Sequence, residues 1–223
     1  MNAAGLPGLP GLPEPLELRE LLELHARSLE SAARLVDTVQ PEQLVLATPC
    51  AGWTLRELLA HAVGQHRGFA AAARGAGPDL ALFAAVPVGN DPAGPFRRSA
   101  AELAAAFAEA AADGGRRLRL PEIRADGTFP LRLAVGFHLL DTLVHSWDVA
   151  AALGVGAGVA AAVDGEPRLA AALLAVAERV PAGPADRVPG SAFRERLEPG
   201  AAGPFHRALA LLGRDPAWAL PAR

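Results

Sequence analysis

The stretch PLRLAVGFHLLDTLVHSWDVAAAL, residues 130–153, predicts a long helix that is apolar on most of its surface. Pro130 suits the first position of a helix, and Gly154 directly after the stretch is a common helix end. Much of this helix is expected to face an interior, because most of its side chains are apolar, among them Leu139, Leu140, Leu143, Val144 and Val149. Other segments of the chain must then cover it.

Three upstream segments predict helices of similar length, because their apolar side chains recur at three- and four-residue steps. These helices are expected over residues 15–39, 55–74 and 94–114. Thr54, followed three residues later by Glu57, forms a capping box at the start of the second helix. Four helices of about 20 residues predict an all-α four-helix bundle. Residues 75–95, rich in glycine and proline, are expected to form its long crossover loop.

The two ends of the chain have a different character. Residues 1–15 repeat Gly-Leu-Pro three times and are predicted to be a flexible arm. Residues 116–129 fit either a short hairpin or an extended connection, and two shorter helices are expected at 166–180 and 204–212. We therefore divide the chain into the arm, a bundle over 16–153, and a C-terminal extension over 154–223 that packs on the bundle.

Composition excludes several function classes. The chain has 223 residues, 51% of them hydrophobic, and a net charge of −3, so it is not a basic nucleic-acid-binding protein. A single cysteine excludes an internal disulfide and favours the reducing cytoplasm. Charges interrupt every apolar run before 18 residues, and the start lacks a basic flank, so neither a membrane span nor a signal peptide is expected.

Histidines and one aspartate form the main chemical pattern. Asp141 and His145 are four residues apart and share one face of their helix, and His138 lies seven residues before His145. His61 lies among apolar residues of the second predicted helix, which points it inward. Buried carboxylates and imidazoles are costly unless they pair or bind a metal.

A metal site in a helix bundle needs inward ligands from facing helices, often two from one helix one turn apart. His61, Asp141 and His145 meet this requirement and would leave a coordination position open, as catalytic zinc sites do. The alternative for Asp141 and His145 is a surface ion pair, which is common at this spacing. The pattern alone does not choose between them.

Two long motifs carry a family resemblance. TPCAGWTLRELLAHAVG (residues 48–64) and LDTLVHSWDVA (140–150) resemble the DinB-like bundle proteins related to mycothiol-dependent maleylpyruvate isomerase, and ALLGRDPAW (210–218) is similar to the ending of a metal-binding branch. The resemblance implies a DinB-like four-helix bundle whose divalent ion, zinc or else nickel or iron, is held by His61, Asp141 and His145. It also implies mycothiol, or less readily bacillithiol, as a thiol cofactor.

The chain departs from the isomerase pattern at two places. Asp141 stands where that pattern has glutamate, which shortens the ligand by one methylene and could let His138 assist. Residues 154–223 do not resemble the larger C-terminal domain of the isomerase. These differences leave the metal and the reaction open.

Other candidate residues have a functional and a structural interpretation. Cys50 could be a nucleophile, although packing is commoner for a lone cysteine. Asp148 could orient the His145 ring through its second nitrogen, or form a cap or an arginine pair. His25 is expected to be a core histidine. Trp53 and Trp147 are expected to be core anchors at helix ends, and His66 and His206 to be surface or packing residues. The arginines at 97, 98, 116, 117 and 119 either bind an acidic ligand or are solvated.

Three function hypotheses follow. The first is a metal- and thiol-dependent transferase or isomerase that joins a small-molecule thiol to an electrophilic substrate, with the metal stabilising the thiolate. The second is a non-catalytic metal-binding or ligand-sensing module, and the third is a structural bundle without metal. A monomer or homodimer is expected in each case, with neither nucleic acid nor membrane as a partner.

Overall fold

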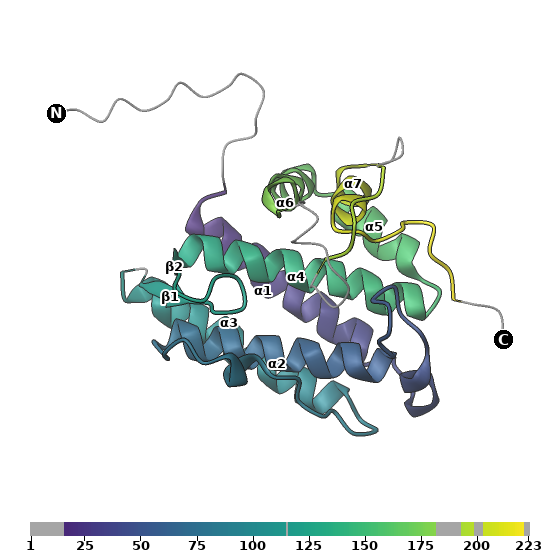
Figure 1. The fold of residues 1–223 in the computed structure, drawn as a ribbon, viewed down its shortest axis with the longest axis horizontal. Helices are drawn as coiled ribbons and strands as arrows, with labels where there is room; N and C mark the ends of the chain where they lie inside the picture. The colour runs from purple at the N-terminus through teal and green to yellow at the C-terminus, as the bar shows by residue number, and fades with distance from the viewer. Residues whose placement is uncertain (1–15, 115, 182–192, 199–202, 221–223) are drawn as a thin grey trace, which may run out of the picture.

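The four long helices predicted from the sequence are all present. The computed structural model describes residues 16–114, 116–181, 193–198 and 203–220, drawn in colour in Figure 1. The bundle helices are α1 (Leu18–Val36), α2 (Leu55–Ala73), α3 (Ala93–Ala112) and α4 (Leu131–Ala152). The predicted all-α class is confirmed, and the predicted N-terminal arm lies outside the described residues.

The helices pack as two layers that share one core. α1 packs on α4, α2 packs on α3, and further contacts join α1 to α3 and α2 to α4. Leucine and alanine build most of the core, with Phe107 and Trp147 among its largest fully buried side chains. Trp147 is therefore the core anchor that the sequence predicted. α4 has buried residues on all sides, because α5 and α6 cover the face that the bundle leaves open.

The start of α2 is fixed by the predicted capping box. The Thr54 side chain accepts from the backbone N–H of Glu57, and the Glu57 carboxylate accepts from the backbone N–H of Thr54. The crossover loop contains a short 3-10 helix, η2 (Leu80–Phe83), that lies directly on α2. Gly64 and Gly68 permit this approach, because a Cβ atom there would overlap the Ala84 carbonyl and the Phe83 ring, respectively.

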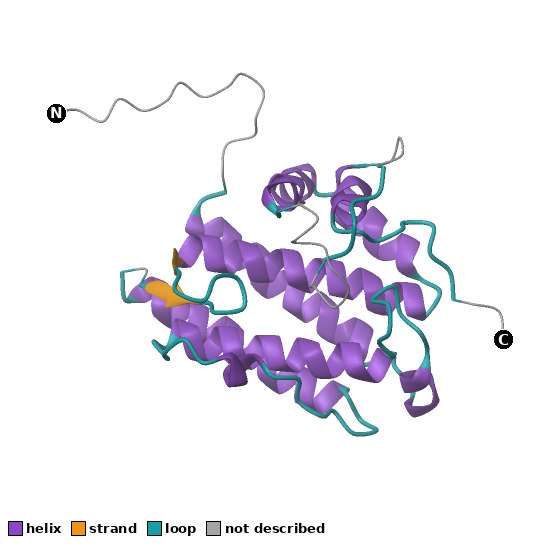
Figure 2. Cartoon of the chain, viewed as in Figure 1, coloured by secondary structure: helices purple, strands orange, loops and turns teal. Residues whose placement is uncertain are grey.

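The segment before α4 is a hairpin, which decides between the two predicted alternatives. Strands β1 (Arg117–Arg119) and β2 (Thr128–Pro130) pair in antiparallel register, with Leu118 opposite Phe129. Pro130 therefore ends β2, and α4 begins one residue later than predicted. Figure 2 shows this hairpin at one end of the otherwise helical molecule.

The C-terminal part adds three helices on the α4 side of the bundle. They are α5 (Gly156–Asp164), α6 (Pro167–Arg179) and α7 (Pro204–Leu211), and they lie together in Figure 1. The sequence predicted α6 and α7 but missed α5, whose glycines and short length weaken the helical pattern. Asp164 at the end of α5 accepts from the backbone N–H of Phe205 (2.9 Å), which ties α7 to α5.

Among the described residues, no helix is both long enough and apolar enough to cross a membrane.

Candidate metal centre

Facing turns of α2 and α4 bring the three predicted ligands together. One potential ligand atom each from His61, Asp141 and His145 lies within 4.8 Å of the others. The two imidazole rings meet edge to face at 5.2 Å between centroids. Asp141 Oδ1 lies 3.3 Å from His145 Nε2, with 31% of the Asp141 side chain and 12% of the His145 side chain exposed. The group is thus half-buried, and solvent reaches it past Asp141.

The second nitrogen of His145 is held by another carboxylate. His145 Nδ1 donates to Asp148 Oδ2 at 2.9 Å, and Asp148 has no exposed side-chain surface. A carboxylate only accepts, so Nδ1 carries a proton in this contact. Asp148 is therefore in position to orient the His145 ring through its second nitrogen, which is one of the roles that sequence analysis proposed for it.

The surroundings shift the pKa values of these groups in opposite directions. Burial lowers the pKa of His61 to about 4, so its imidazole is neutral near pH 7. Burial opposes charge on His145 as well, but Asp141 and Asp148 outweigh it and hold its pKa well above the usual value. Burial tends to raise the pKa of Asp141, yet the neighbouring His145 brings it far below the usual range.

These contacts fit a cation between the three side chains. The raised pKa keeps His145 protonated on both nitrogens when no metal is bound, so its Nε2–H faces the Asp141 carboxylate at 3.3 Å. A divalent ion between these groups would take the place of that proton, with the Nε2 lone pair and the carboxylate as ligands. Zinc ligands at 2.0–2.2 Å from an ion lie up to about 4 Å from one another, so small side-chain movements would suffice. A cavity of about 20 Å³ adjoins Asp141 and His145, but its lining is mostly apolar and does not include His61, so it is not itself the space between the three side chains.

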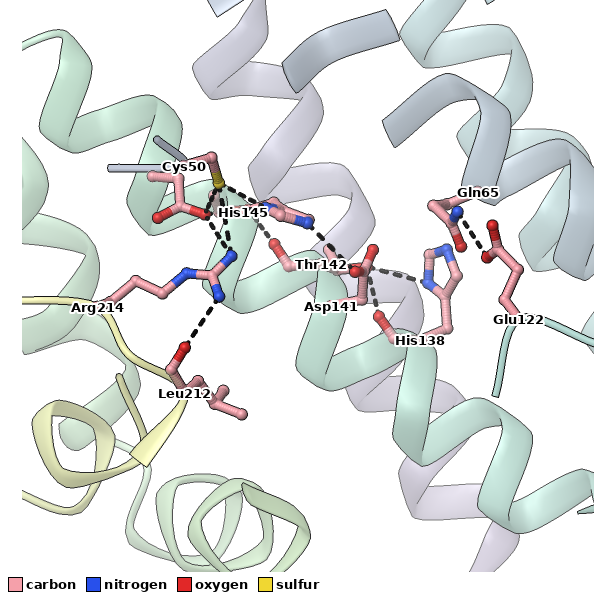
Figure 3. Close-up of polar contacts among 11 residues, drawn as sticks. Cys50, Gln65, Glu122, His138, Asp141, Thr142, His145, Leu212 and Arg214 are labelled. Atoms are coloured by element: carbon pink, nitrogen blue, oxygen red, sulfur yellow. Dashed lines mark hydrogen bonds and ion pairs between the residues drawn. The ribbon is translucent and has the colours of Figure 1, made fainter. Parts of the chain in front are cut away.

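A second polar network lies on the opposite side of His145. Cys50 Sγ donates to Asp148 Oδ2 at 3.0 Å and lies 3.9 Å from His145 Nδ1. Arg214 Nη2 lies 3.4 Å from the same carboxylate oxygen and 3.5 Å from Sγ (Figure 3). Sequence analysis left Cys50 as either a nucleophile or a packing residue, and the structure places its thiol in a charged, hydrogen-bonded group.

Two loops position this network. The Thr48 hydroxyl donates to the carbonyls of Cys50 and Trp53, which closes the turn ahead of α2. Gly213, at φ +76°, ends α7 in the left-handed region, and Arg214 follows it with its N–H bonded to the Leu209 carbonyl. Sequence analysis assigned no role to Arg214, although this residue lies inside the motif at residues 210–218.

Trp53 is not the core anchor that the sequence predicted. Its side chain is 37% exposed, and its ring lies on His61 at 4.9 Å between centroids. It therefore forms one wall of the candidate site.

The hairpin loop supplies a further carboxylate near the site. Gln65, one turn after His61 on α2, donates to Glu122 Oε2 at 2.8 Å (Figure 3). Partial burial raises the pKa of Glu122, and the charge of Asp141 adds to the shift. Sequence analysis missed Glu122, because its position depends on how the hairpin folds over α2.

His138 lies away from the three candidate ligands, so the suggestion that it assists them is not supported. It is fully buried, with Nδ1 at 3.0 Å from both His25 Nε2 and Thr142 Oγ1. His66 is also buried and bonds Ser99 Oγ at 2.8 Å. The core position predicted for His25 is confirmed.

The remaining histidine and several arginines have structural partners. His206 lies 3.5 Å from Asp164, at the contact between α5 and α7. Arg97 pairs with Asp37, Arg116 pairs with Asp113, and Arg117 donates to Thr128. These contacts agree with a solvated surface rather than with a ligand site.

Known proteins resemble this chain in sequence and in fold. Residues 25–150, which include both helices of the candidate site, match the family described as mycothiol maleylpyruvate isomerase N-terminal domain. The chain belongs to this family. It is also 34% identical over 199 residues to the uncharacterized protein Rv0738 of Mycobacterium tuberculosis strain H37Rv, and the match spans 86% of this chain and 97% of that protein. The corresponding protein of strain CDC 1551, MT0763, gives the same values.

A solved structure has the same fold. The crystal structure of the mycothiol-dependent maleylpyruvate isomerase matches with a TM-score of 0.54 and 16% identity, over 73% of this chain and 70% of that one. At this identity the likeness establishes the helical fold and leaves the reaction open.

Proposed function

We propose that His61, Asp141 and His145 bind a divalent metal ion, with zinc as the first choice. The observation that carries this proposal is the doubly oriented His145: its Nδ1 donates to buried Asp148, and its Nε2 faces Asp141 at 3.3 Å. Metal-binding histidines usually donate their other nitrogen to a carboxylate in this way. His61 on the facing helix completes a ligand set that leaves a position open.

We further propose that the bound ion serves a thiol-dependent transferase or isomerase reaction. Family membership supports this step, because the related solved enzyme is described as mycothiol-dependent. When bound, a divalent ion lowers the pKa of a coordinated thiol, so that thiolate is present near neutral pH. Mycothiol is therefore the first thiol to test.

The protein's own side chains would orient the reactants. Asp148 keeps the His145 ring in one tautomer, and Trp53 covers the outer side of His61. Asp141 keeps nearly a third of its side chain exposed, which marks the approach from solvent. Glu122, with its raised pKa and its bond to Gln65, is placed to exchange a proton with a substrate near that approach.

Metal binding is tested on untagged protein by elemental analysis and zinc titration. We expect about one equivalent of a divalent ion per chain. His61→Ala should lose it, whereas His206→Ala, which removes a histidine at the α5–α7 contact, should retain it. Wild-type protein that binds no divalent ion would refute the proposal.

The thiol step is tested separately by calorimetry with mycothiol, bacillithiol and glutathione, on zinc-loaded and chelated protein. Thiol binding that requires the metal, followed by turnover with an electrophile panel that includes maleylpyruvate, is the expected result. If zinc binds and no thiol does, the non-catalytic metal-binding module becomes the better proposal.

A further inference from the structure

His145 lies between two groups of potential metal ligands. The first group is His61, Asp141 and His145, and the second is Cys50, His145 and Asp148, in which one atom from each residue also lies within 4.8 Å of the others. The two groups use opposite sides of the ring, because Nε2 faces Asp141 while Nδ1 faces Asp148 and Cys50. A neutral imidazole offers one lone pair, so it serves one group at a time.

The second group is chemically well suited to a metal. Thiolate, imidazole and carboxylate are all zinc ligands, and thiolate favours softer ions. Its atoms are already close, with 3.0 Å from Cys50 Sγ to Asp148 Oδ2 and 2.9 Å from Asp148 Oδ2 to His145 Nδ1. Ligand chemistry and spacing alone would therefore let an ion choose the Cys50 group.

Arg214 adds a fixed positive charge beside the second group. Its Nη2 lies 3.4 Å from Asp148 Oδ2 and 3.5 Å from Cys50 Sγ, and only 6% of its side chain is exposed. A guanidinium stays protonated at any pH the protein experiences. A divalent ion held by Cys50 and Asp148 would lie within a few ångströms of this charge in a buried setting, where repulsion is poorly screened.

We propose that Arg214 decides which ligand group takes the metal: its charge excludes a cation from Cys50, His145 and Asp148 and directs the ion to His61, Asp141 and His145. Arg214 also neutralises Asp148, which then remains the acceptor for the Nδ1 proton of His145. Arg214 is thus a positioning residue from the C-terminal part of the chain. This inference rests on the proposed metal site.

Cobalt(II) absorption distinguishes the two groups, because a thiolate ligand adds a near-ultraviolet charge-transfer band that histidine and carboxylate lack. Wild-type protein titrated with cobalt chloride should show visible d–d bands and no thiolate band. Arg214→Met should bind cobalt with the thiolate band at about one thiolate per ion. In that variant the Cys50 S–H bond breaks, an Sγ–Co bond forms and the proton passes to the buffer.

Three variants serve as controls. The thiolate band should vanish in Arg214→Met combined with Cys50→Ser. Arg214→Lys, which retains the charge, should match the wild-type spectrum. Arg207→Met changes an exposed arginine on α7 and should leave the spectrum unaltered.

The outcomes separate the inference from the metal site itself. A thiolate band in the wild type, or its absence from folded, cobalt-loaded Arg214→Met, would overturn the role of Arg214 while leaving metal binding established. If Arg214→Met does not fold, Arg214→Gln replaces it, and the wild-type spectrum still decides the first point. A wild-type chain that binds no cobalt would refute the site and the inference together.

Discussion

The two halves of α4 carry histidines of the same stripe in opposite surroundings. His145 lies between the carboxylates of Asp141 and Asp148 and keeps 12% of its side chain exposed. His138, two turns earlier, is fully buried, with rings of His25, His66 and Phe69 within 5.4 Å between centroids. Figure 3 shows His138 and His145 on this one helix.

The partners, rather than the residue type, give each half its chemistry. Carboxylates hold the pKa of His145 well above its usual value, whereas burial and two neighbouring imidazoles hold that of His138 well below it. His138 Nε2 has no hydrogen-bond partner among the described residues, so this group contributes little beyond packing. The half of α4 around His145, which we call the site half, therefore carries the proposed cation site, whereas burial opposes any charge in the half around His138, which we call the core half.

The largest expected difference concerns metal binding. His145→Ala should weaken zinc binding by more than the roughly 10- to 100-fold loss typical of changes to outer partners, because it removes a direct ligand. His138→Ala should leave zinc stoichiometry and affinity within a few-fold of wild type. Competition titration against a chelating dye measures both, and equal losses would erase the distinction between the two halves of α4.

Folding stability should depend more strongly on His138 than on His145. His138→Ala removes a fully buried ring and leaves a cavity, which we expect to cost about 3 kcal/mol of unfolding free energy. Urea denaturation with a chelator present measures this without a metal contribution. A loss of unfolding free energy below about 1 kcal/mol would mean that the side chains around His138 move in to fill the cavity.

Local sequence signals predicted the four-helix bundle and the three proposed metal ligands. The Thr54–Glu57 capping box, the Gly-Pro-rich crossover and the 3.6-residue periodicity depend on neighbours in the chain, and the structure contains all three. The spacing of Asp141 and His145 follows from helix geometry alone. His61 was placed by its apolar neighbours and by the family motif.

Long-range contacts could not be predicted in the same way. Arg214 reaches Cys50 and Asp148 from 164 and 66 residues away, and Glu122 reaches Gln65 only after the hairpin folds over α2. No local period encodes such contacts. Trp53 was misassigned for a related reason, since its exposure depends on where the site opens.

Zinc affinity should change less when the residue replaced is one that hydrogen-bonds to a histidine of α4 rather than the histidine itself. Asp148→Asn keeps the side-chain shape but removes the charge that orients His145, so zinc affinity should fall roughly 10- to 100-fold. Thr142→Val, its counterpart beside His138, should change zinc affinity less than about 2-fold. Because Asp148→Asn also removes the partner of Arg214, binding should be measured well below the melting temperature.

The smallest expected effect is a change in pH dependence in the core half. Burial lowers the pKa of His25 to about 3 and that of His66 to about 4, whereas both titrate near 6.5 when the chain is unfolded. As the pH falls below 6.5 the unfolded chain takes up protons first, so stability is lost between pH 6.5 and about 4. Each such histidine contributes up to about 1.4 kcal/mol per pH unit.

His25→Met isolates one of these contributions, because it removes a single buried imidazole and retains an apolar side chain of similar size. The slope of unfolding free energy against pH, measured by urea denaturation with a chelator between pH 6.5 and 5, should fall by up to about 1.4 kcal/mol per pH unit. His145, whose pKa is raised in the folded protein, contributes equally to the slope of the wild type and of His25→Met, so it cancels from this comparison. If the slope is the same in His25→Met as in the wild type, water or a proton must enter the core half. The difference in histidine pKa between the core half and the site half would then not hold.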